Sequence, residues 1–93
     1  MTDSPKTIYK YEILGMESSL DLPQGAQVLA AQVQGQSVCL WVLVDPSLAT
    51  ERRSFAVYGT GWPLPANAGT FIAIIHLPES GLVWHVFESD KTI

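Results

Sequence analysis

The sequence predicts an all-β protein, folded as a small antiparallel sandwich or a partly open barrel of about six or seven strands. Turn-forming Gly, Pro and Asn residues interrupt the chain at short intervals, and the stretches between them are rich in β-branched and aromatic residues. No window shows the 3.6-residue periodicity of an amphipathic helix. With 93 residues, 47% of them hydrophobic, residues 1–93 suit a single domain. We expect an ordered core over about 7–88 and short mobile tails.

Each predicted strand follows from the turn signals on its two sides. Turn-forming residues at Gly15, Pro23–Gly25, Gly35, Asp45–Pro46 and Gly59–Gly69 separate the first six segments in that order, and Pro78–Gly81 precedes the last. Asp45 and Pro46 are also suited to the start of one helical turn at 46–50, although an extended loop fits that segment as well. The predicted strands are Thr7–Ile13, Ser19–Leu22, Ala26–Val33, Ser37–Val44, Arg53–Tyr58, Thr70–Leu77 and Leu82–Glu88.

The turn at Gln34–Gly35 predicts a hairpin with a two-residue loop, which would place Ala31 opposite Val38. Side chains then alternate between two faces. The reverse face mixes small polar residues with Cys39 and Trp41, so we expect something to cover it. The face predicted to enter the core carries Leu29, Ala31, Val33, Val38, Leu40, Val42 and Val44.

The last two strands predict a second hairpin, with Leu77 opposite Leu82, that is apolar on both faces. Such a pair must lie between layers, in a barrel, or against another protomer. We therefore expect a homo-oligomer whose interface includes Trp41, Cys39 and Phe87. One face carries Phe71, Ala73, Ile75, Leu77, Leu82, Trp84 and Val86, and the other carries Ile72, Ile74, His76, Val83, His85 and Phe87.

A few polar and aromatic residues are candidates for binding a ligand. The Arg52–Arg53 pair suits a phosphate or carboxylate, although a solvated pair neutralised by Glu51 is the structural alternative. Trp62, in a rigid Gly–Pro loop, and Tyr58 are candidates to stack on a base, unless Trp62 only fastens its loop to the core. His76 and His85 would supply hydrogen bonds, either to a ligand or within the fold. The ligand-binding candidates are Arg52, Arg53, Tyr58, Trp62, His76 and His85.

Several classes of chemistry lack their sequence signature. Gly59–Pro65 has neither the third glycine nor the following helix of a dinucleotide-binding loop, and no nucleophile elbow occurs. The two histidines are half a metal site with no further ligand predicted nearby. Nothing local marks Cys39 as a reactive thiol. We therefore expect no catalytic residue, no metal and no cofactor. The formal net charge of -4 argues against general nucleic-acid binding.

Two long uncharged runs, at 22–44 and 54–78, raise the question of a membrane span. Glutamines interrupt the first, and glycines and prolines interrupt the second, so neither provides the roughly 20 apolar residues of a spanning helix. The N-terminus lacks the basic and apolar regions of a secretory signal. The sequence therefore favours a soluble, cytoplasmic protein without a membrane partner.

Four segments carry a resemblance to known proteins: Val38–Pro46, Arg53–Phe55, Gly59–Gly61 and Leu82–Glu88. With these segments the chain resembles a family of small, uncharacterised all-β proteins encoded by phages and prophages. The resemblance extends from Tyr9 to Glu88 and implies a place in the cytoplasm of an infected bacterium. It provides no catalytic residues.

The leading functional hypothesis is a non-enzymatic phage counter-defence protein that sequesters a small anionic signalling nucleotide of the host between protomers. The first alternative is a protein–protein inhibitor of a host factor, acting through an apolar face or a sheet edge. The second is a small component of the virion or of its assembly.

Overall fold

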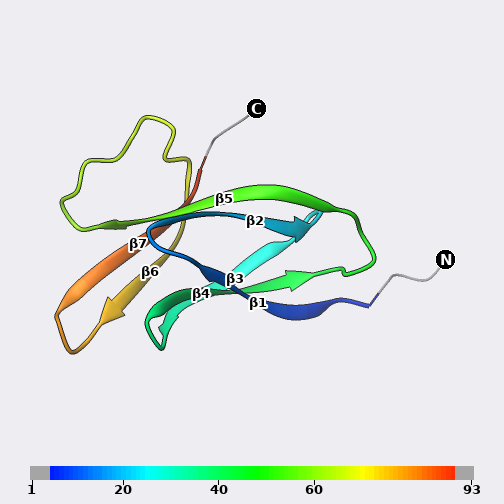
Figure 1. Cartoon of the computed structure of the whole chain (residues 1–93), viewed down its shortest axis with the longest axis horizontal. Helices are drawn as coiled ribbons and strands as arrows, with labels where there is room; N and C mark the ends of the chain where they lie inside the picture. Colours follow the sequence, from blue (N-terminus) through cyan, green and yellow to red (C-terminus); the bar gives the residue numbers. More distant parts are fainter. Residues whose placement is uncertain (1–4, 90–93) are drawn as a thin grey trace.

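The computed structural model describes residues 5–89 and confirms the all-β class (Figure 1). These residues form two antiparallel sheets that do not close into a barrel, and they include no helix, hence none able to cross a membrane. The tails predicted to be mobile fall mainly on 1–4 and 90–93, outside the described residues. The strands are β1 Thr7–Ile13, β2 Glu17–Pro23, β3 Gln27–Gln34, β4 Ser37–Val44, β5 Thr50–Gly59, β6 Thr70–Leu77 and β7 Leu82–Glu88.

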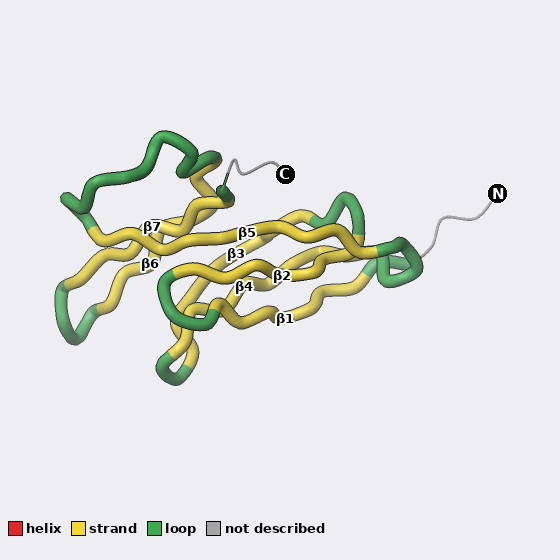
Figure 2. The backbone as a smooth tube through the Cα atoms, turned by 45° about the horizontal axis from the view of Figure 1, so that its top comes forward, coloured by secondary structure: helices red, strands yellow, loops and turns green. Residues whose placement is uncertain are grey.

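The two sheets form a sandwich around one core (Figure 2). The three-stranded sheet has the order β1-β4-β3, and the four-stranded sheet has the order β2-β5-β7-β6. The chain passes from one sheet to the other after β1, after β2 and after β4. Alternate residues of each strand therefore meet the opposite sheet. The largest fully buried side chains are Phe55, Ile13, Leu22, Leu40, Val42, Val44 and Val86.

The first hairpin has its predicted faces but a different turn. Gly35 and Gln36 form the loop, and Val33 pairs with Val38, whereas the sequence predicted Gln34 and Gly35 as the loop. Gly35 has a φ of 65°, and a type II′ turn places such a glycine first in the loop. Moving the turn by one residue shifts the pairing by two, so the alternation of faces is unchanged.

Two bulges overturn the predicted placement of two large side chains. A register shift between Val28 and Ala30 removes Leu29 from the core face. The side chain of Leu29 is therefore 47% exposed. A second shift, between Phe71 and Ala73, places Phe71 beside Phe87 on the outer face and lets Ile72 pack on the core. An extra residue on one strand reverses the alternation beyond it. The predicted Leu77–Leu82 pair is confirmed.

Residues 45–49, the segment compatible with a helical turn, form a tight turn and no helix. The amide of Leu48 donates to the carbonyl of Asp45, at 3.1 Å, and the amide of Ser47 donates to Oδ1 of Asp45, at 3.0 Å. The aspartate thus organises the turn with its own side chain. β5 begins immediately afterwards, at Thr50, three residues before its predicted start.

Side chains of the same chain help to cover the outer face of β4. Cys39 lies there and is only 3% exposed, while Trp41 is half-buried. Lys10 of β1 donates a hydrogen bond to Gln34 of β3, and this bond spans β4, which lies between those strands. The long apolar stem of a lysine can shield such a surface from water. Part of the expected cover over this face is therefore intramolecular.

Candidate functional site

Arg52 and Arg53 point to opposite faces of β5. Arg52 lies on the outer face of the four-stranded sheet, where its Nε is 3.4 Å from Oδ1 of Asp21, and both side chains are largely exposed. Arg53 shares the inner face with Phe55, because neighbouring residues of a strand alternate. The two guanidinium groups of one chain therefore cannot bind the same anion.

Arg53 belongs to a polar cluster at the edge of the core. Its Nε and Nη2 donate to the two carboxylate oxygens of Glu88, at 2.6 and 2.8 Å, and its Nη1 donates to the carbonyl of Ala26, at 2.6 Å. Its guanidinium carbon is 5.9 Å from the ring centroid of Phe55. The hydrogen bond to Glu88 is the main cause that raises the pKa of Arg53. These contacts join β5 and β7 of the four-stranded sheet to the turn that leads into β3.

Trp62 fastens the long loop between β5 and β6 to the four-stranded sheet. Its ring meets that of Trp84 edge to face, with centroids 5.5 Å apart. It also lies over Gly59, where an added Cβ would be 2.7 Å from Cε2 of Trp62. The buried Ala68 holds the other end of the loop. Trp62 is nevertheless 47% exposed, so the two roles that the sequence left open for it, fastening the loop and stacking on a ligand, both stay predictions.

We predict that Gly59→Ala separates the two tryptophans and destabilises the protein by about 1–3 kcal/mol, the usual cost of overpacking. Exciton coupling between Trp62 and Trp84 in circular dichroism measures the separation, and urea unfolding measures the stability. Trp62→Phe is the reference for a lost coupling. An unchanged exciton band in Gly59→Ala would contradict the assigned close packing.

The outer face of β5, β7 and β6 gathers most of the other candidates into one surface, which we call the aromatic face. Register aligns Tyr58, His85 and Ile74 in one row across the three strands. Phe87 meets Tyr58 and Phe71 edge to face, with centroids 5.8 and 5.7 Å apart. Phe71 and Ile74 are 53% and 46% exposed. The aromatic face consists of Tyr58, Phe71, Ile74, His76, Val83, His85 and Phe87.

The two histidines lie on the aromatic face as diagonal neighbours, as the predicted register required. His76 pairs with Val83, and His85 pairs with Ile74. His85 is half-buried, with Nε2 2.9 Å from Oγ1 of Thr60, whereas His76 is exposed. Over residues 5–89, no group of three or more His, Cys, Asp or Glu side chains is placed to hold a metal ion.

The structure brings together only part of the candidate set. Tyr58, His76, His85 and Phe87 share the aromatic face, but Trp41 and Cys39 lie on the outer face of the other sheet. Sequence reasoning missed Phe71, because only the bulge moves it to this face. It also paired the arginines with Glu51, whereas Glu88, 35 residues along the chain, binds Arg53.

Comparison with known proteins adds one finding. Residues 4–93 match the model of a family described as a domain of unknown function, DUF7352. The chain belongs to this family. No curated protein and no solved structure matches it. The DUF7352 domain includes all seven strands and the whole aromatic face. Phage origin stays a prediction that rests on the sequence resemblance.

Proposed function

We propose that this DUF7352 protein is a non-enzymatic binding protein that recognises a protein partner through its aromatic face. The supporting observation is that seven neighbouring side chains on β5, β7 and β6 include three aromatic rings and no Asp, Glu, Lys or Arg. The cores of protein interfaces are enriched in aromatic residues and depleted of charged ones.

The surroundings of the aromatic face resemble the polar rim of an interface. Glu17, Asp21 and Arg52 lie on the outer face of the same sheet, on β2 and the first half of β5. On the outer face of this sheet, apolar and aromatic side chains thus lie together on β7, β6 and the end of β5, and charged side chains lie on β2 and the first half of β5. Clustering of this kind marks interaction sites more often than scattered apolar residues do.

Nucleotide sequestration has less support from the geometry. Arg52 and Arg53 diverge, and three donors of Arg53 already bind Glu88 and Ala26. On the outer face of the four-stranded sheet, the arginine among the described residues is Arg52, which lies on the first half of β5 and already pairs with Asp21. The hypothesis stays a prediction, and calorimetric titration with cyclic and ADP-ribose-type nucleotides tests it.

We predict that a photo-crosslinking amino acid at position 71 captures one discrete protein in the bacterial cell that expresses the chain. Phe71 is exposed and packs against Phe87 at the β6 end of the aromatic face, so a partner seated there lies within reach of the probe. Mass spectrometry of the crosslinked band identifies the partner. From the phage resemblance we expect the partner to be a host protein or a virion protein, so the chain is expressed in the bacterium that the phage infects.

The matched control carries the same probe at position 8. Ile8 is 54% exposed and lies on β1, the edge of the three-stranded sheet that is opposite to β3 and the groove. The same band from both positions, or none from position 71, would contradict the proposal. A band of twice the chain mass from position 71 would instead assign the aromatic face to the predicted homo-oligomer.

A further inference from the structure

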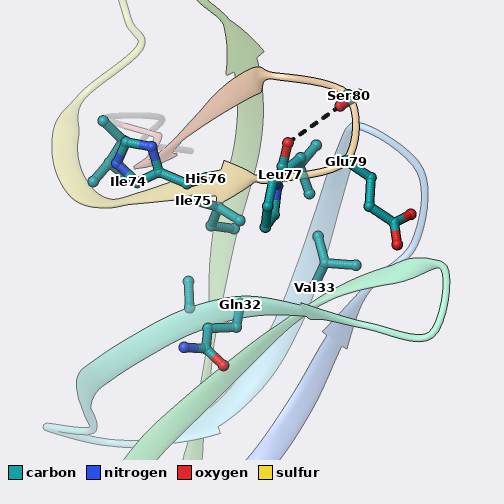
Figure 3. A pocket seen from close by; sticks show the side chains of 10 residues that line it. Gln32, Val33, Ile74, Ile75, His76, Leu77, Glu79 and Ser80 are labelled. Carbon is teal, nitrogen blue, oxygen red and sulfur yellow. Dashed lines mark hydrogen bonds between the residues drawn. The ribbon is translucent and has the colours of Figure 1, made fainter.

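A groove of about 660 Å³ separates the edge of β3 from the edge of β6 (Figure 3). Both strands are the last of their sheets, and within residues 5–89 no backbone hydrogen bond joins one to the other. Each therefore presents backbone N–H and C=O groups along one side. The groove is lined by residues 31–33 of β3 and by residues 74–80 of β6 and the turn that follows.

The two strand edges that border the groove lack charged residues, which are one of the usual protections against pairing. β1 carries Lys10 and Glu12, and β2 carries Glu17 and Asp21, and charges on an edge strand discourage a further strand. β3 and β6 contain no Asp, Glu, Lys or Arg. Their bulges lie before residues 31 and 74, so the parts that line the groove are regular.

The walls of the groove suit an extended peptide with alternating side chains. Ile75 and Ala31 are buried at its base, and Leu77 and Val33 pack against the core beside them. Ile74 and His76 point to the other side of β6, onto the aromatic face. A strand paired with β6 would place alternate side chains in the groove and on the aromatic face. The regular stretch of about four residues spans roughly 13 Å of strand.

The carboxylate of Glu79, at one end of the groove, indicates the charge of the peptide that would bind there. Glu79 lies in the turn after β6, is exposed, and has no ion pair or hydrogen bond in the described part of the chain. No Lys or Arg lines the groove. A Lys or Arg on the bound peptide would therefore meet a complementary charge at this end.

We propose that the protein partner contributes an extended segment that adds to the four-stranded sheet along β6 and carries a Lys or Arg beside Glu79. The inference rests on the proposed function in taking the partner to be a protein, and it extends the aromatic face to the adjoining sheet edge. Binding by strand addition takes its affinity from backbone hydrogen bonds and its specificity from alternate side chains.

The experiment selects binders from a display library of random nonapeptides and measures them by calorimetry and amide chemical shifts. We expect enriched peptides with alternating apolar positions and a basic residue, which shift the amides of residues 74–77. Two versions of each peptide are compared, one N-methylated at the odd positions and one at the even positions. Because a strand pairs through one edge, N-methylation should weaken binding about tenfold or more in one version and little in the other. Glu79→Lys should weaken basic peptides about two- to fivefold.

Three results would overturn the inference: no enrichment, equal effects of the two N-methylated sets, or amide shifts confined to other strands. These results are separable from failure of the proposed function. Peptide binding is measured on the isolated chain, whereas the aromatic face is tested by crosslinking from position 71 in cells. Glu79→Lys lies in an exposed turn outside the aromatic face, so we expect this variant to fold normally. Its unfolding curve is the control that separates a loss of peptide binding from a loss of structure.

Discussion

Replacing Arg53 with methionine is expected to lower the free energy of unfolding by about 3 kcal/mol. The substitution keeps much of the apolar stem but removes all three donors to Glu88 and Ala26. The side chains of Arg53 and Glu88 are only 18% and 24% exposed, so the remaining carboxylate would stay largely shielded from water without its partner. Breaking a buried pair by removing one member typically costs about 3–5 kcal/mol, and partial exposure places this pair at the lower end. Urea unfolding at neutral pH measures the loss.

The neighbouring arginine is a matched control for this prediction. Arg52 forms an ion pair with Asp21 on the exposed face, and exposed pairs contribute at most about 1 kcal/mol. We expect Arg52→Met to change the free energy of unfolding by less than that amount. Equal losses from the two substitutions would contradict the structural role assigned to Arg53. In the double variant Arg53→Met/Glu88→Leu, part of the lost stability should return, because no shielded carboxylate remains.

The strands were predictable because their signals are local. Glycines, prolines and other turn formers separate runs of β-branched and aromatic residues, and β1, β4, β6 and β7 have the predicted bounds. The hairpin of β6 and β7 follows from the short interval between Leu77 and Leu82. The early starts of β2 and β5 were missed because charged and polar residues at these ends resemble loop sequence. These ends are held in the sheet because β2 pairs with β5 along the whole length of β2.

The candidate site was only partly predictable because most of it depends on strand order. Tyr58 meets Phe87 only because β7 lies between β5 and β6, and no local signal specifies that order. The same order brings Glu88 to Arg53. The groove requires the edge of β3 to lie beside the edge of β6, which belongs to the other sheet. The diagonal histidines were predictable because one hairpin holds both.

Replacing Leu40 with alanine is expected to lower the free energy of unfolding by about 2–5 kcal/mol. Leu40 is fully buried on β4, so the substitution leaves a cavity that the surrounding sheets can only partly fill. A domain of this size has a total stability of about 5–15 kcal/mol, so the variant retains a reduced margin. Urea unfolding measures the difference, with Leu40→Val as the milder substitution if Leu40→Ala does not fold.

The same substitution at position 29 tests the bulge in β3. Uninterrupted alternation places Leu29 and Leu40 on one core face and predicts similar losses, whereas the bulge leaves Leu29 47% exposed. We expect Leu29→Ala to cost less than about 1 kcal/mol. A loss comparable to that of Leu40→Ala would contradict the bulge. It would indicate regular alternation along β3, with Val28 on the outer face of the sheet. Residues 31–33, which line the groove, lie beyond the bulge and keep their pairing with β4 in either case, so this pair of variants tests the bulge separately from the strand-addition proposal.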